Sequence, residues 1–337
     1  MRSYHLGPAS GTLLTPALRR YLAKPILRLL PRSLPANAIT LVAHGSLFAV
    51  PFVAAIEGHT RPVAASCAIV VLILLFVIGD ELDGMQAFRI QGTSPLGEFL
   101  DHYLDSFVSG TLLYTAYALY DISSLELLLP TIGCTFLTGA AMYYEQHHTG
   151  TMIFEAISTT ESLALAAVLA GLSPVAAARQ VAHVEVAPGS SLLAVFLLAT
   201  SFAILAPTVT RSFLRSKVLP PQWVAFAVGL AGVIAGILLT TTGLAMAAAI
   251  VVLYGCSHAG SVILRHLRDG RVPFPDPVAP IALLASAVAA RPLAPFVQIA
   301  ALAYLGIRCA WTSGVAAVFL DRPRESDPAR AFPRENA

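Results

Sequence analysis

The sequence predicts an all-α polytopic membrane protein, and three observations support this fold class. Of the 337 residues, 56% are apolar and only 12% are charged, whereas soluble domains carry roughly 25% charged residues. The mean hydropathy is +0.74. The apolar residues gather in runs that reach, or nearly reach, the roughly 20 helical residues needed to cross a hydrocarbon core. The net charge of +2 gives no indication of a nucleic-acid partner.

Residues 1–35 predict a cytoplasmic amphipathic helix that lies in the membrane interface. Leucine and isoleucine recur near one helical face and basic residues occupy the rest, as is typical of interfacial helices. The apolar positions are Leu14, Leu18, Leu22 and Ile26, and the basic ones are Arg19, Arg20, Lys24 and Arg28. Pro16 and Pro25 limit each helical piece, so we expect a bent element.

About ten transmembrane helices follow. The predicted spans are 38–56, 63–80, 99–120, 125–144, 160–178, 190–210, 221–240, 242–264, 278–291 and 293–320. The ninth is short, so nine crossings result if it is re-entrant. We divide the chain into the surface helix (1–35), a catalytic membrane core (36–210), additional transmembrane helices (211–320) and a polar cytoplasmic tail (321–337).

The distribution of basic residues predicts the topology. In a ten-span arrangement, 17 of the 21 lysines and arginines fall on the side of the N-terminus. Because cytoplasmic loops carry the excess of positive charge, we expect a multi-pass protein with both termini in the cytoplasm. Arg308 falls inside the last span, and its role is not evident from the sequence.

Four aspartates lie where two very hydrophobic segments meet. Asp80 and Asp83 are three residues apart, and Asp101 and Asp105 are four apart, so each pair shares one face of a helix. Carboxylates at membrane depth cost several kcal/mol unless they are paired, hydrated or bound to a cation. Oxygen ligands favour hard cations, so the arrangement predicts a site for Mg²⁺ or Mn²⁺, with a diphosphate as the partner of the ion.

The same stretch follows the pattern D-x2-D-G-x2-A-R-x8-G-x3-D-x3-D, from Asp80 to Asp105. It therefore resembles the CDP-alcohol phosphotransferase family. Phe88 stands where the pattern has arginine, with Arg89 next to it. The resemblance implies a metal-dependent membrane enzyme of phospholipid biosynthesis, with its active site at the cytoplasmic boundary.

Further matches point to one branch of the family. The runs Asp83 to Arg89, Ser94 to Glu98, Leu34 to Thr40 and His148 to Thr151 are similar to the choline and ethanolamine phosphotransferases. Such enzymes move a phosphoalcohol from CDP-choline or CDP-ethanolamine to a diacylglycerol hydroxyl and release CMP. Residues 180–337 match only in hydropathy and in the number of spans.

The resemblance also assigns roles to residues. It implies metal ligation by Asp80, Asp83, Asp101 and Asp105. It implies contact with the CDP moiety by Asn37, Thr40, Gly84, Ala87, Gly97 and Arg89. Asn37 and Thr40 serve equally well as caps of the first transmembrane helix. Glu145, His148 and Glu161 are candidates for the acceptor or headgroup side, although interfacial solvation also accounts for them. Either Asp105 or His102 is expected to be the base that deprotonates the acceptor.

Three departures from the branch leave alternatives open. Phe88 removes a cation, Met85 replaces a lysine, and Tyr103 replaces a glycine beside the metal site. One alternative is a phosphatidyltransferase that uses CDP-diacylglycerol as the donor. Another is a non-catalytic or transport protein on the same fold. We also expect a homodimer.

Overall fold

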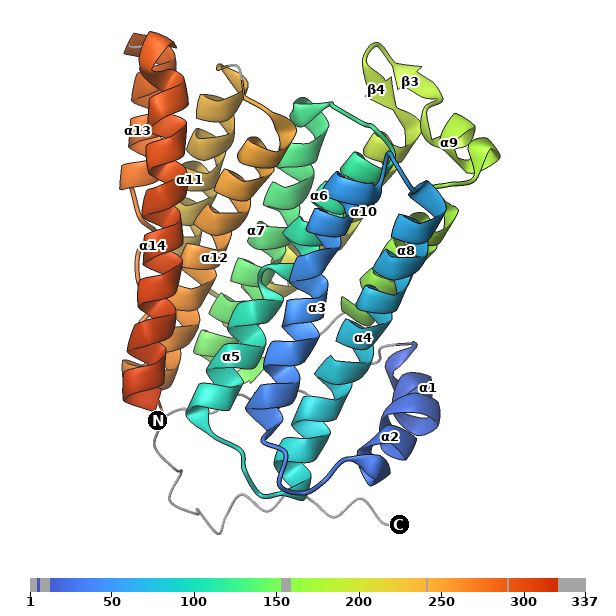
Figure 1. Cartoon of the computed structure of the whole chain (residues 1–337). Coiled ribbons are helices and arrows are strands. Elements are labelled where there is room, and N and C mark those ends of the chain that lie inside the picture. Colours follow the sequence, from blue (N-terminus) through green and yellow to red (C-terminus); the bar gives the residue numbers. More distant parts are fainter. Residues whose placement is uncertain (1–4, 7–12, 153–158, 241, 290, 321–337) are drawn as a thin grey trace.

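Helices account for nearly all of the described chain. The structure is a computed structural model that describes residues 5–6, 13–152, 159–240, 242–289 and 291–320. The long helices run side by side between two ends of one bundle (Figure 1). The predicted all-α membrane class is thereby confirmed. The predicted polar tail, residues 321–337, lies outside the described residues.

The N-terminal half of the bundle contains five helices that are consecutive in the chain. They are α3 (Ala36–Glu57), α4 (Pro62–Arg89), α5 (Pro95–Asp105), α6 (Val108–Leu119) and α7 (Leu125–Thr149). Helix α3 packs against α4, α5 and α6. The close approach of α3 and α4 requires Gly79, because a Cβ there would lie 2.6 Å from the Cβ of Ala43.

The remaining helices complete the bundle. They are α8 (Thr159–Leu172), α9 (Ala176–Ala182), α10 (Leu192–Ser216), α11 (Pro221–Leu238), α12 (Leu244–Asp269), α13 (Val278–Ala289), the 3-10 turn η2 (Arg291–Leu293) and α14 (Ala294–Leu320). Short strands β3 (Glu185–Ala187) and β4 (Ser190–Ser191) form a hairpin beside α9. Helix α12 is the central one, since most of its residues are buried and it packs against α5, α6, α7, α11 and α14.

Among the described residues, fewer helices qualify as candidate membrane spans than the ten predicted. All ten predicted segments are helical, but seven helices of the described chain are long and apolar enough to cross a membrane, or eight if α8 and α9 are one bent span. The segment predicted at 99–120 is divided between α5 and α6, where the Ser106 hydroxyl donates to the Tyr103 carbonyl. The helix axis bends by 120° between α8 and α9, at a break that contains Pro174.

The short ninth segment has a physical explanation. Helix α13 has 12 residues, and residues 271–276 before it are non-helical. Two prolines in this stretch, at 273 and 275, and a third directly after it, at 277, prevent a helix from continuing. Asp276 reaches the middle of the neighbouring helices, because its oxygens accept hydrogen bonds from Tyr254 of α12 and Tyr304 of α14. The segment therefore covers part of the membrane depth without a helix.

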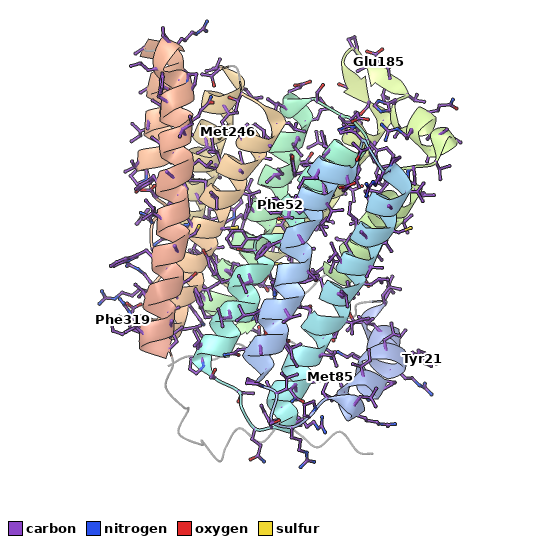
Figure 2. All side chains as sticks on the ribbon, viewed as in Figure 1. Tyr21, Phe52, Met85, Glu185, Met246 and Phe319 are labelled. Atoms are coloured by element: carbon purple, nitrogen blue, oxygen red, sulfur yellow. The ribbon has the colours of Figure 1, made fainter. Side chains whose placement is uncertain are left out.

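The N-terminal element is helical from residue 15 to residue 29, and Pro16 and Pro25 each lie in the first positions of a helical piece. It consists of α1 (Thr15–Leu18), a π-helical turn η1 (Arg19–Ala23) and α2 (Lys24–Leu29). Figure 1 shows it beside the lower end of α4, and Figure 2 places Tyr21 and Met85 at this end and Glu185 at the opposite end. Leu22 and Leu29 are exposed on it, which suits a helix lying in the membrane interface. A second small pairing joins β1 (His5–Leu6) to β2 (Thr151–Met152) in parallel.

Candidate metal centre and active-site cavity

Helices α4 and α5 bring the four predicted aspartates together. Asp80 and Asp83 lie in the last third of α4, while Asp101 and Asp105 lie in the second half of α5. Ser94 begins α5, because its hydroxyl accepts a hydrogen bond from the amide of Gly97 at 3.0 Å. The charges of Asp83, Asp101 and Asp105 all act on Asp80, so the four carboxylates form one electrostatic group.

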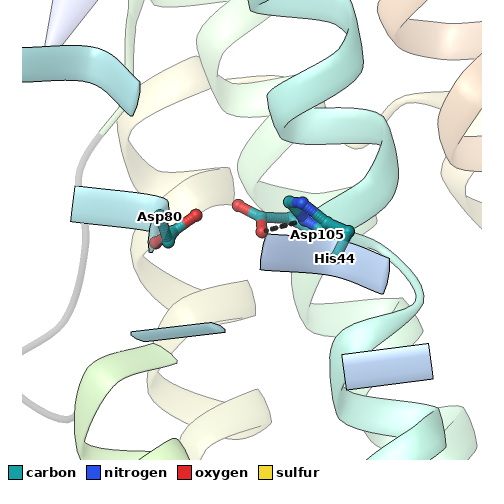
Figure 3. Close-up of side chains that lie close together, drawn as sticks. All are labelled: His44, Asp80 and Asp105. Atoms are coloured by element: carbon teal, nitrogen blue, oxygen red, sulfur yellow. Dashed lines mark hydrogen bonds and ion pairs between the residues drawn. The ribbon is translucent and has the colours of Figure 1, made fainter. Parts of the chain in front are cut away.

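His44 of α3 joins this group. Ligand atoms of His44, Asp80 and Asp105 all lie within 4.8 Å of one another. Figure 3 shows the two carboxylates facing each other, with the imidazole beside Asp105. The sequence reasoning did not identify His44. The available signal was a histidine in an apolar span, one helical turn after Thr40 and therefore on the same face.

The contacts of His44 favour positive charge at this point. Its Nδ1 lies 2.9 Å from the carbonyl oxygen of Thr40, and its Nε2 lies 3.2 Å from Oδ1 of Asp105. A carbonyl oxygen only accepts, so Nδ1 carries the hydrogen. With Nδ1 as the donor, Nε2 offers its lone pair beside a carboxylate, and a cation next to both groups suits this pair of ligands.

The four aspartates have the charge and chemistry of a divalent cation site. Within the described residues, none of them forms an ion pair with lysine or arginine, whereas Glu81 on the neighbouring position pairs with Arg19 at 2.5 Å. Asp83 is buried, and its Oδ2 accepts a hydrogen bond from Thr40 at 2.5 Å. Buried carboxylates without a cation repel each other. A hard cation with oxygen ligands fits this donor set.

The small residues of the motif lie beside the carboxylates. A Cβ at Gly97 would lie 2.9 Å from Oδ1 of Asn37, so Asn37 packs directly on this glycine. Gly84 is exposed, and a Cβ there would meet nothing within 4 Å. Ala87, one turn further along α4, is half-buried. Packing against Asn37 therefore explains why residue 97 has no side chain. No such contact explains Gly84, where the open space is available to a ligand.

Arg89 faces away from the aspartates. Its Nη1 donates to the carbonyl oxygens of Leu27 at 2.6 Å and Leu30 at 3.0 Å. These carbonyls end α2, and cations stabilise such helix C-termini. The described position of Arg89 thus connects the surface helix to α4.

A cavity opens on the other side of Asp105. It has a volume of about 150 Å³, and His102 and Asp105 line it together with residues of α7, α11 and α12. Nδ1 of His102 lies 3.5 Å from Oδ2 of Asp101. A second cavity, of about 270 Å³ and mainly apolar, shares five wall residues with the first. These are Ser109, Thr135, Gly139, Met142 and Thr159.

The three residues predicted for the acceptor side line neither cavity. Glu145 is buried and pairs with Arg215 and with Arg211, the latter at 3.3 Å. Oε1 of Glu161 accepts the amide hydrogens of residues 13 and 14 at the start of α1, at 2.8 Å and 3.0 Å. His148 is exposed, and its ring contacts His147.

Tyr103 is part of the protein core. Its side chain is buried and stacks on Phe99, and its hydroxyl donates to the Cys309 carbonyl at 3.3 Å. The ring occupies the place that a Cβ of Gly260 in α12 would take. The large side chain of Tyr103 on α5 therefore fits against α12 because Gly260 has no side chain.

The fold and site define an integral membrane protein with a carboxylate-rich group suited to a cation, next to a mainly apolar cavity of about 270 Å³. The sequence model of the CDP-alcohol phosphatidyltransferase family matches residues 34–187. This segment is a domain of that family, which assigns it to phosphotransfer from a CDP-alcohol in phospholipid synthesis. A search of curated proteins found no significant match.

Proposed function

We propose that the protein transfers an ethanolamine-phosphate or choline-phosphate group from a CDP-alcohol to the hydroxyl of a diacylglycerol-like lipid and releases CMP. One observation carries this proposal: Asp105 belongs to the carboxylate group on one side and to the wall of the cavity on the other. A donor held at the carboxylates and a lipid held in the cavities would meet at this residue.

The aspartates are suited to hold the donor. Asp80, Asp83, Asp101 and Asp105 would bind Mg²⁺ or Mn²⁺, which neutralises the diphosphate and stabilises the CMP leaving group. Asn37, Thr40, Gly84, Ala87 and Gly97 would contact the CDP moiety. The support for this role is that Thr40 donates to Asp83, that Asn37 packs on Gly97, and that Gly84 and Ala87 follow Asp83 on α4 with open space at Gly84.

His102 is the better candidate for the base. Asp105 is already engaged by His44, whereas His102 lines the cavity with Asp101 near its Nδ1. A carboxylate in this position orients an imidazole and stabilises its protonated form. In this assignment His102 takes the proton of the lipid hydroxyl while the hydroxyl oxygen bonds to the β-phosphorus. The bond from that phosphorus to the CMP oxygen breaks at the same time.

The proposed orientation has the carboxylate end in the cytoplasm. The support is the excess of basic residues at this end of the helices, including Arg89 of α4, Arg215 of α10 and Arg268 of α12. CDP-alcohols are charged and water-soluble, so an active site at this boundary can receive them directly.

Detergent-purified protein with diacylglycerol and Mg²⁺ or Mn²⁺ tests the proposal. We expect metal-dependent CMP release with CDP-ethanolamine or CDP-choline. Release from CDP-diacylglycerol with polar alcohols, and not from the small CDP-alcohols, would instead identify a phosphatidyltransferase. No CMP release from any of these donors would contradict both and favour a non-catalytic protein.

A further inference from the structure

One nitrogen of a buried histidine in the cavity wall has no hydrogen-bond partner in the part of the chain that the structure describes. His258 lies in the middle of α12 and is 4% exposed. It lines the same cavity as His102 and Asp105. Its Nε2 lies 3.0 Å from the hydroxyl of Tyr144, whereas its Nδ1 is buried without a hydrogen-bond partner among the described residues. An unpaired buried polar atom destabilises a fold. A ligand bound in the cavity could supply the missing hydrogen-bond partner.

The surroundings hold the imidazole in a fixed orientation. Its ring stacks on Phe226 of α11, with ring centres 4.3 Å apart and planes within 18°. Tyr144 of α7 is itself 1% exposed and fixes the Nε2 edge. Three helices therefore position one ring, which is the arrangement expected of a group that must meet a ligand in a defined geometry.

The position of His258 favours the lipid over the nucleotide. The residues beside the carboxylates come from α3, α4 and α5, whereas His258 lies on the wall built by α7, α11 and α12. This cavity adjoins the larger apolar one, with which it shares five wall residues. A molecule that occupies both has an apolar body and a small polar group at the His102 end. This description fits a neutral glycerolipid.

Resting on the proposed function, we propose that His258 is a positioning residue for the lipid acceptor, with its Nδ1 hydrogen-bonded to a hydroxyl or ester oxygen of the lipid. The Tyr144 hydroxyl can accept from or donate to Nε2, so either neutral tautomer is available. One tautomer lets Nδ1 accept from the lipid hydroxyl, and the other lets it donate to an ester carbonyl. His258 lies outside residues 34–187, the segment that the family match covers.

Two amide substitutions separate the two nitrogens of the ring. His258→Gln reaches toward Tyr144 and removes the group at Nδ1, while His258→Asn is shorter and keeps an amide near Nδ1. We expect His258→Gln to raise the apparent KM for diacylglycerol in mixed micelles about tenfold, because one buried hydrogen bond to the ligand is lost. The KM for the CDP-alcohol should stay within about twofold, and His258→Asn should keep most of the lipid affinity.

Tyr117→Phe is the matched control. Tyr117 is also fully buried, and its hydroxyl has no hydrogen-bond partner among the described residues, but it lines neither cavity. Tyr144→Phe leaves His258 in place without its anchor, and we expect an intermediate rise in lipid KM. It serves as the test if His258→Gln does not fold, as judged by gel filtration and thermal unfolding. Equal lipid KM values in Tyr144→Phe, His258→Gln and Tyr117→Phe would overturn the inference, as would a rise confined to the donor KM.

A binding measurement separates this inference from the proposed function. Photocrosslinking of a diazirine-labelled diacylglycerol to the full chain, in EDTA and without donor, needs no turnover. Weaker labelling of His258→Gln than of Tyr117→Phe supports the lipid site even if the parent releases no CMP. Unchanged labelling in a parent that does release CMP overturns the lipid site and leaves the proposed function standing.

Discussion

Two groups of charged side chains at membrane depth differ in whether a lysine or arginine pairs with their carboxylates. On α4 and α5, four aspartates act on one another with no lysine or arginine paired to them in the described chain. Between α12, α13 and α14, Arg308 lies 3.6 Å from Asp276 and also donates to Tyr304 and Ser257. The second group contains an arginine as its counter-charge, whereas the described partners of the first are two histidines, His44 beside Asp105 and His102 beside Asp101.

This difference separates function from structure. An ion pair that is complete within the protein lowers the cost of placing charge in a membrane and needs no ligand. A set of carboxylates without counter-charge raises the free energy of the folded state until a cation binds. The comparison therefore predicts that substitutions in the first group change activity, whereas substitutions in the second change stability.

The largest effect is expected for Asp80→Asn. The amide keeps the shape of the carboxylate but lacks the charge that holds a divalent ion, so CMP release should fall by about 10³ or more. The same variant should melt at a higher temperature than the parent in EDTA, because one repelling charge is gone. Mn²⁺ should raise the melting temperature of the parent and much less that of the variant.

Asp269→Asn at the exposed end of α12 is the control, since this carboxylate pairs with Arg268. It should change neither turnover nor the Mn²⁺ effect. Normal turnover in Asp80→Asn would contradict the prediction, because the aspartates of α4 and α5 would then be no more important for activity than Arg308 and Asp276.

His102→Ala should separate chemistry from metal binding. Loss of a general base costs on the order of 10² to 10⁴ in rate, and donor and metal affinities should stay near those of the parent. Asp105→Asn should impair both metal binding and rate, since Asp105 lies in the carboxylate group and the cavity wall. Turnover over a pH series, with Mn²⁺ titrations, measures the two quantities. Unchanged turnover in His102→Ala would return the base assignment to Asp105.

Arg308→Met should destabilise the protein without changing kcat. It leaves the Asp276 carboxylate, 7% exposed, without its cation. Removing one member of a buried pair costs about 3–5 kcal/mol, and the partial exposure of Arg308 should reduce the loss to roughly 2 kcal/mol. Thermal unfolding of the double variant Arg308→Met, Asp276→Asn should recover much of it. A loss of turnover with normal stability would place this group in the catalytic machinery.

The sequence was sufficient for the helices because long apolar runs at membrane length leave few alternatives. Their interruptions were harder to predict. Helix α5 ends at Asp105 and α6 begins at Val108, and at this break the amides of Ser106 and Phe107 bond to carbonyls three residues back. The apolar run continues through the break, so hydropathy does not reveal it. The segment before α13 was predictable as short, but its course along the mid-membrane Asp276 depends on Tyr254 and Tyr304 of other helices.

Site residues that repeat at helical spacing could be predicted from the sequence, whereas isolated ones could not. The aspartates follow helical periodicity, so their common face could be inferred. His44 and His258 are single histidines in apolar spans, and only the packing of helices brings them to Asp105 and to the cavity. The direction of Arg89 toward Leu27 and Leu30 likewise depends on where the surface helix lies.

The pairing of Tyr103 with Gly260 predicts a smaller loss of stability. Gly260→Ala places a methyl group where the Tyr103 ring lies, and overpacking of this kind costs about 1–3 kcal/mol. Combining it with Tyr103→Leu should restore part of the stability, because the smaller side chain leaves room for the methyl group. Thermal unfolding of the two single variants and the double variant measures the coupling. Additive losses would show that the two residues do not share one space.

The smallest effect is expected at Phe88, where the family pattern has arginine. Phe88 is 68% exposed at the end of α4, while the aspartates one and two turns earlier form the group that lacks counter-charge. An arginine placed here is separated from that group and surrounded by a high dielectric, so its charge should act weakly. We therefore expect Phe88→Arg to change CMP release by no more than about threefold, with Phe88→Leu as the uncharged control. A large gain in Phe88→Arg alone would show that the first group needs a cation from the protein as well as the metal, and that the parent chain is impaired by lacking it.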